Sequence, residues 1–95
     1  MLKHLIKFEI SPTEYILVSV QAEFINLCLD GLRKYMTIGL RYAGKDNIQG
    51  FATWFVRYAK TAIICTNQTK VSDYDGYFYV SFDYEDGYYK CGEIK

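Results

Sequence analysis

The strongest constraint on the fold is a short turn pattern that occurs twice within residues 70–94. This segment reads KVSDYDGYFYVSFDYEDGYYKCGEI, and both Asp75-Gly76 and Asp86-Gly87 lie between β-forming residues. Asp-Gly in this setting is typical of a tight hairpin turn, because a type I′ turn requires positive φ at both central positions. The pattern predicts three short antiparallel strands, a C-terminal β-meander, with both glycines at positive φ.

The residues between the two turns alternate between two kinds of side chain. Successive side chains of a strand point to opposite faces of the sheet, so one set is expected to face the core and the other to form a Tyr-rich outer face. With a two-residue loop at the second turn, Tyr84 is expected opposite Tyr89, and Asp83 opposite Lys90. The core-facing set is Phe78, Val80, Phe82 and Tyr84, and the outward set is Tyr77, Tyr79, Ser81 and Asp83.

Composition predicts one globular domain over residues 1–95. The chain has 95 residues, of which 51% are apolar and 18% aromatic, and this length supports a single hydrophobic core. The formal net charge is zero, but the charges are segregated. Residues 72–89 contain five Asp or Glu and no Lys or Arg, whereas residues 1–71 contain nine Lys or Arg and five Asp or Glu. One end of the sheet is therefore predicted to be acidic and aromatic on a mildly basic body.

The first twenty residues fit two structures. Residues 2–10 alternate as a strand, and the next four read SPTE. As a turn with Pro12 in its second position, these four close a hairpin onto a strand over Tyr15–Val20. As a capping box, they begin a helix that runs to Met36. The hairpin is favoured, because the β-branched run YILVSV forms helix poorly.

Two later segments, about residues 21–36 and 47–61, have the apolar spacing of amphipathic helices. Residues 37–42 and 62–66 are β-prone. The expected fold class is α+β, with two helices packed on one face of a mainly antiparallel sheet that ends in the three-stranded C-terminal β-meander. The predicted buried stripe of the second helix is Ile48, Phe51, Ala52, Phe55, Tyr58, Ala59 and Ala62.

Residues that support catalysis or metal binding are few and scattered. Cys28, Cys65 and Cys91 lack the CxxC spacing of zinc and redox sites, so they are expected to be reduced thiols. The one histidine, His4, lies in no motif, and turn formation explains the aspartates better than a calcium loop does. We expect no enzyme activity, no cofactor and no metal. A cytoplasmic location is expected, because the sequence has no signal-peptide pattern and no apolar run of membrane-spanning length.

The acidic, Tyr-rich surface predicts a non-enzymatic protein-interaction module. Tyrosine is rigid, amphipathic and enriched in binding surfaces, and carboxylates suit a partner with a basic surface, such as a nucleic-acid-handling enzyme. An inhibitor of the immunity or phage anti-defence type would work in this way. The expected partner-binding residues are Tyr77, Tyr79, Asp83, Tyr84, Glu85, Asp86, Tyr88 and Tyr89, with Asp73 and Asp75 steering the encounter.

Two other functions would use the same residues. A single-stranded nucleic-acid-binding protein would stack bases on the tyrosines and place phosphates near Lys70, Lys90 and Lys95, but the neighbouring carboxylates would repel those phosphates. Alternatively, the tyrosines cover the sheet of a structural or self-associating domain, such as a homodimer.

Overall fold

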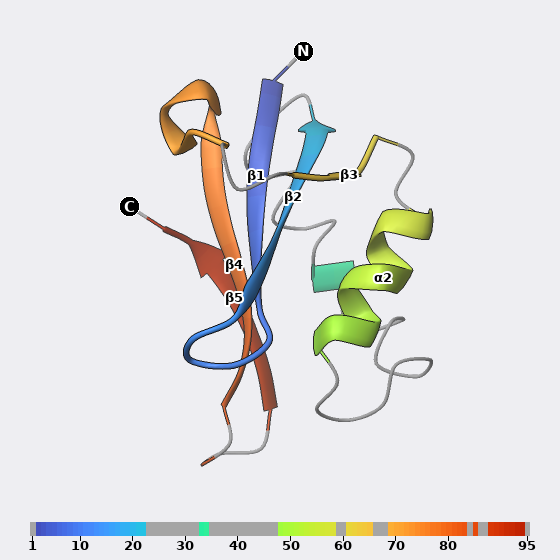
Figure 1. Cartoon of the computed structure of the whole chain (residues 1–95), viewed down its shortest axis with the longest axis vertical. Coiled ribbons are helices and arrows are strands. Elements are labelled where there is room, and N and C mark those ends of the chain that lie inside the picture. The colour runs from blue at the N-terminus through green and yellow to red at the C-terminus, as the bar shows by residue number, and fades with distance from the viewer. Residues whose placement is uncertain are drawn as a thin grey trace.

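The computed structural model describes residues 2–22, 33–34, 48–58, 61–65, 69–83, 85 and 88–94. In this part of the chain, one five-stranded sheet lies beside the helix α2 (Ile48–Tyr58), as Figure 1 shows. The strands are β1 (Leu2–Glu9), β2 (Tyr15–Ala22), β3 (Ile63–Ile64), β4 (Gly76–Asp83) and β5 (Tyr88–Glu93).

The strand order is β3-β2-β1-β4-β5. β1 and β4 run parallel, and every other neighbouring pair is antiparallel. The predicted α+β class with a mainly antiparallel sheet is therefore confirmed. The parallel pair places β4 beside the first strand of the chain, so the C-terminal hairpin β4–β5 extends the sheet that β1 and β2 begin.

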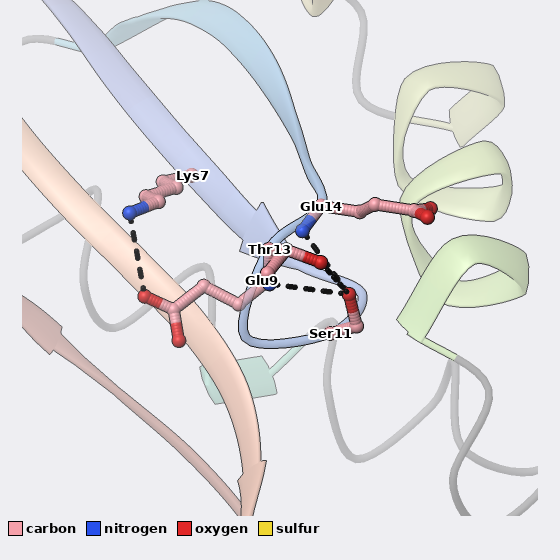
Figure 2. Close-up of polar contacts among 5 residues, drawn as sticks. All are labelled: Lys7, Glu9, Ser11, Thr13 and Glu14. Carbon is pink, nitrogen blue, oxygen red and sulfur yellow. Dashed lines mark hydrogen bonds and ion pairs between the residues drawn. The ribbon is translucent and has the colours of Figure 1, made fainter.

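The turn between β1 and β2 is closed by the side chain of Ser11 (Figure 2). Ser11 Oγ accepts hydrogen bonds from the backbone N–H of Thr13 at 3.3 Å and of Glu14 at 3.1 Å. The Ser11 C=O accepts the Glu14 N–H at 3.4 Å, which leaves Pro12 in the second position of the turn. The favoured hairpin is confirmed and the capping-box helix is wrong, because Ser11 satisfies turn N–H groups and Tyr15 then starts a strand.

The helix predictions agree with the structure in part. α2 confirms the second helix over Ile48–Tyr58. Of the rest of the predicted span 47–61, residue 61 lies in a turn, and 47, 59 and 60 lie outside the described residues. Within the first predicted helix, 21–36, Gln21 and Ala22 instead end β2, and Arg33 and Lys34 are helical. The strand continues this far because the ladder with β1 reaches Ala22 and because Thr61 Oγ1 bonds both the N–H and the C=O of Gln21. The remaining residues of 21–36, and the strand expected at 37–42, lie outside the described residues.

The core fills the space between the sheet and α2. Phe8 of β1 lies at its centre, with its ring centroid 5.6 Å from that of Phe51 and 5.5 Å from that of Phe55. Burying an aromatic side chain of this size contributes about 1.5–3 kcal/mol relative to leaving it exposed. The buried core residues of the described part are Ile6, Phe8, Val18, Ile48, Phe51, Ala52, Phe55, Phe78 and Val80.

Alternation along β4 follows the sequence prediction. Phe78 and Val80 are fully buried against α2, and Phe82 is partly buried at the margin of the same core. Tyr77 and Tyr79, between them, point to the other side of the sheet. Tyr84, the last member of the predicted core-facing set, lies outside the described residues.

The first Asp-Gly pair does not form a hairpin turn, so the three-stranded meander is wrong. Residues Val71–Asp73 form a short 3₁₀ helix instead of a strand, and Gly76 begins β4 with φ outside the left-handed region. Asp75 joins the chain to the start of β1: its N–H donates to the Lys3 C=O, and its Oδ2 accepts the Lys3 N–H, both at 2.8 Å. Asp75 is therefore the residue that docks β4 onto β1.

Gly76 is required for space rather than for its backbone angle. It lies opposite His4 in the parallel ladder, and a Cβ at this position would lie 2.7 Å from His4 Nδ1. Real Cβ atoms do not make contacts this short, so a larger residue would displace the His4 ring.

The second turn has a longer loop than the sequence predicts. β4 and β5 pair Asp83 with Tyr88 and Phe82 with Tyr89, so the connection is residues 84–87 instead of Asp86-Gly87 alone. Asp83 Oδ1 accepts the Glu85 N–H at 3.0 Å, a side-chain turn that ends the ladder two residues early. The predicted direct pairs, Tyr84 with Tyr89 and Asp83 with Lys90, are thus wrong. A shift of two residues preserves the faces, and Lys90 Nζ still lies diagonally 3.8 Å from Asp83 Oδ2.

Candidate functional site

The side of the sheet that faces away from α2, called the outer face below, carries the tyrosines of β4. Tyr77 and Tyr79 alternate with buried Phe78 and Val80, and both are partly exposed. By the same alternation, β2 places Tyr15 and Leu17 on this face, because Val18 belongs to the core. The predicted Tyr-rich face is therefore present in β4 and continues onto β2.

The chain crosses the outer face between β3 and β4. At the start, the Cys65 N–H donates to the Leu17 C=O at 2.8 Å, and at the end Asp75 binds Lys3 of β1. The crossing segment (residues 69–75) is also joined to β3 through Tyr74, whose hydroxyl lies 3.7 Å from Cys65 Sγ. Leu5, which follows buried His4 and precedes buried Ile6, is itself fully buried on the outer face. This face is therefore partly covered in its middle and open toward β2 and β3.

A groove of about 380 Å³ lies where the crossing segment leaves β2 exposed. The large hydrophobic residues that are exposed in the described part of the chain all line this groove or adjoin it. Tyr15 is 55% exposed, Ile64 59% and Val71 45%, and Ile63, next to Ile64, is 65% exposed. The groove residues are Tyr15, Ile16, Leu17, Ile64, Cys65, Thr69, Val71 and Tyr77.

Charged groups lie along one rim of this groove. Lys7 Nζ is 4.8 Å from the centroid of the Tyr15 ring and 3.7 Å from Glu9 Oε1, the ion pair drawn in Figure 2. A cation over an aromatic ring contributes about 0.5–1 kcal/mol at an exposed site. Asp73 and Asp75, exposed on the crossing segment, bring carboxylates to the same face.

A polar contact beside the groove joins the thiol of Cys65, which lines it, to the phenol of Tyr74. Burial raises the pKa of Tyr74, and the neighbouring Cys65 and Asp73 raise it further, against the lowering effect of a hydrogen bond to Ser19. The phenol is therefore protonated at neutral pH. It does not act as a base toward Cys65.

Two of the predicted acidic site residues have roles in the structure that the sequence analysis did not foresee. Asp83 holds the β4–β5 loop through Glu85, and Asp75 docks β4 on β1. Asp83 also pairs with Lys90, its expected charge partner, across a diagonal instead of directly. Asp73 and Glu85 are exposed. Ser81, in the outward set, is only 8% exposed.

The four remaining predicted site residues are described little or not at all. Tyr84 and Asp86 lie outside the described residues. For Tyr88 and Tyr89 the structure describes the backbone, which pairs Tyr88 with Asp83 and Tyr89 with Phe82. Asp83 is an outward position of β4, and Phe82 packs against the core. The eight-residue contact surface therefore stays a prediction.

The groove itself was missed by the sequence prediction. Ile64 lies in the two-residue strand β3 and Val71 in the short 3₁₀ helix, and their proximity depends on the path of the crossing segment. Two adjacent isoleucines in a two-residue edge strand were the signal in the sequence, since such a pair is hard to bury from both sides.

His4 is a second unusual feature, on the side of the sheet that faces α2. It is fully buried, and among the described residues neither ring nitrogen has a hydrogen-bond partner. Its ring meets Phe78 edge-on, with the centroids 5.6 Å apart. Burial lowers the pKa of His4, although Asp75 and Glu93 oppose this effect, so the ring is neutral at pH 7.

Within the described residues, no three His, Cys, Asp or Glu side chains gather in a way that could hold a metal ion. No helix in the same part of the chain has the length and apolarity needed to span a membrane. Comparison with protein-family models, with curated proteins and with solved structures finds no match to this chain.

Proposed function

We propose that this chain is a non-enzymatic protein-interaction module that binds a partner protein through the outer face of its sheet. The observation that carries this proposal is the gathering of exposed Tyr15, Ile64 and Val71 along one groove. Exposed apolar residues scattered singly are ordinary, but a cluster beside a concave surface is typical of a docking site.

The groove supplies the apolar anchor of this surface. An aliphatic or aromatic side chain of the partner would contact Leu17 and Val71, and would meet Ile64 at the edge strand β3. Tyr15 and Tyr77 would contact the same side chain with their rings and offer hydroxyls to its backbone. Tyrosine serves such a surface well, because it brings a large contact area with little rotamer entropy to lose.

Carboxylates at the edge of this face select the charge of the partner. Exposed Asp73 and Glu85 lie in the segment of the chain that carries acidic residues without basic ones. A partner with a basic surface would be steered by them, which raises the association rate more than the lifetime of the complex. An inhibitor that covers the basic cleft of a nucleic-acid-handling enzyme is the most concrete form of this function.

The groove chemistry supports binding over catalysis. Tyr74 is kept protonated by its raised pKa, and Lys7 is occupied by Glu9 and by the Tyr15 ring. Catalysis requires a base or nucleophile that is activated by its neighbours.

The test is affinity capture from host lysate, with and without nuclease treatment, with three forms of the immobilised protein. Val71→Arg places a charge in the groove, and Thr53→Arg introduces the same side chain at an exposed position of α2. The wild type and Thr53→Arg are expected to retain the same protein in similar amounts. Val71→Arg should retain at least about tenfold less of it, because binding would bury an unpaired charge.

The same experiment separates the rival functions. Equal retention by Val71→Arg would show that the groove is not the docking site. Capture that disappears with nuclease would instead favour the single-stranded nucleic-acid-binding function. With the purified partner, Asp73→Lys combined with Glu85→Lys should mainly slow association, and the slowing should diminish at high salt.

A further inference from the structure

The outer strand β5 presents an unpaired edge. It is the last strand of the sheet, and within the described residues no strand pairs with its other side. In Figure 1, β5 lies beyond β4 at the margin of the described ribbon. At six residues, β5 is three times as long as β3, the strand at the opposite edge. The strand with the longer open ladder is therefore β5.

The direction of each backbone group along this edge follows from one hydrogen bond. The Ile94 N–H donates to the Tyr77 C=O at 2.7 Å, so the backbone of residue 94 faces β4. Alternation in an antiparallel ladder then turns Lys90 and Gly92 toward β4 as well. Tyr89, Cys91 and Glu93 direct their N–H and C=O groups away from the sheet.

We propose that two copies of this chain pair through these edges, with β5 antiparallel to β5 and Cys91 opposite Cys91 of the partner subunit. In this register the backbone of Tyr89 exchanges hydrogen bonds with the backbone of Glu93 of the partner subunit. By symmetry, the backbone of Glu93 does the same with Tyr89 of the partner subunit. A two-fold axis between the two Cys91 residues closes the assembly, and the two sheets become one continuous sheet.

The charges and the shape of the edge select this register. Lys90 lies opposite Gly92 of the partner subunit, where there is no side chain to meet it. The ring of Tyr79 covers that glycine, since a Cβ at Gly92 would lie 3.1 Å from Tyr79 Cε1. Within its own subunit Lys90 Nζ lies 3.8 Å from Asp83 Oδ2. In the dimer Lys90 would turn from there to the partner subunit's Tyr79, an arrangement that favours a cation over an aromatic ring. The smallest shift that keeps the outward backbone groups facing each other is two residues. In one direction, such a shift would place the two Lys90 side chains opposite each other, and like charges in that position are destabilising.

The resulting dimer is a weak and reversible one. A single strand pair buries less surface than the roughly 1,200–2,000 Å² of a stable interface, so self-association depends on protein concentration. It is also independent of the proposed function, because the groove lies at the β2–β3 side of the sheet and stays open in the dimer.

The test uses the two half-buried cysteines, which lie at opposite edges of the sheet. Cys28→Ala with Cys65→Ala leaves only Cys91, and Cys28→Ala with Cys91→Ala leaves only Cys65. Each protein is treated with a short bis-maleimide, and the yield of covalent dimer is divided by the labelling rate with a mono-maleimide. This correction matters because burial raises the pKa of the Cys91 thiol, an effect that nearby Arg33 opposes.

The fraction of the Cys91 protein that becomes covalent dimer is expected to rise with protein concentration. After correction, its yield should be at least about tenfold higher than that of the Cys65 protein, because only residues held opposite each other are bridged efficiently. Equal yields, or no dimer from the Cys91 protein up to its solubility limit, would overturn the proposal.

A second measurement needs no cysteine substitution. Amide exchange of the wild-type protein should slow for Cys91 and Glu93 as concentration rises, while Gly92, already bonded to β4, stays unchanged. Glu93→Pro removes an outward N–H and leaves the β4 ladder intact, so it should abolish this protection without unfolding the protein. Exchange that does not depend on concentration would contradict pairing at β5.

Discussion

The two sides of the sheet use aromatic residues in opposite ways. Toward α2, the rings are phenylalanines that contact one another: Phe8 meets both Phe51 and Phe55, and Phe78 is fully buried beside them. On the outer face, the rings are tyrosines, and Tyr15 and Tyr77 line an open groove. One strand, β4, serves both sides by alternation.

The difference follows from one hydroxyl. A buried Phe leaves no polar atom without a partner, so a cluster of them closes completely. A Tyr hydroxyl needs a partner or water, so a tyrosine face stays at least partly open to solvent unless it is bonded. The molecule thus derives its stability from one side of the sheet and keeps the other side available for contact.

The largest expected effect is on the helix side. Phe51→Ala should lower the free energy of unfolding by about 3–5 kcal/mol, because the ring is fully buried and a cavity remains. Tyr15→Ala, more than half exposed on the outer face, should cost less than about 1 kcal/mol. Urea denaturation of both variants measures the difference, and similar midpoints would show that the outer face is a second core.

The two glycines that face aromatic rings give the next comparison. Gly76→Ala should destabilise by about 1–3 kcal/mol, since the new Cβ meets His4 Nδ1 in a closed site. Gly92→Ala should cost clearly less, because its nearest neighbours are the ring atoms and hydroxyl of Tyr79, which can rotate toward solvent. Thermal melts of the two variants test the order, and a larger loss at Gly92 would mean that the Tyr79 ring is fixed.

These glycines also show what the sequence could predict. Asp75-Gly76 and Asp86-Gly87 look alike, and local propensity predicts a tight turn at both. At the first, the structure instead pairs Asp75 with Lys3, a residue distant in sequence, and Gly76 is selected by its neighbour His4. The alternation of β4, the β1–β2 hairpin and the stripe of α2 depend on local periodicity, so they were predictable.

The candidate site was predictable only where it follows a strand. Tyr77 and Tyr79 were placed on the outer face by alternation alone. Ile64 and Val71 were not predicted to line one groove, because their meeting depends on how residues 69–75 cross the sheet, which no spacing in the sequence encodes. The loop between β4 and β5 was wrong by two residues because Asp83 bonds to Glu85 and ends its own strand.

A smaller effect on stability should come from the titration of His4, which tests how well the helix side of the sheet excludes water. Burial lowers the pKa of His4 below its ordinary value of 6.5. Below pH 6.5 the unfolded chain takes up a proton that the folded protein resists, so stability should fall as the pH drops from 6.5 toward the folded-state value. His4→Leu cannot titrate, and its unfolding free energy should vary less over that range. Parallel pH profiles for the two proteins would show that His4 is solvated after all.

The smallest expected effect is at Val71, and it is the sharpest test of the comparison because Val80 provides a matched partner. Val80→Ala removes two methyl groups from a fully buried site and should cost about 2 kcal/mol or more. Val71→Ala removes the same groups from a side chain that is 45% exposed at the groove, and should change the unfolding free energy by less than about 0.5 kcal/mol. If Val71 contributed as much as Val80, the groove would be a packed part of the fold and its apolar residues would need no partner to explain them. A negligible loss at Val71 leaves those residues without a structural role, and contact with another protein then remains the reason for placing them at the surface.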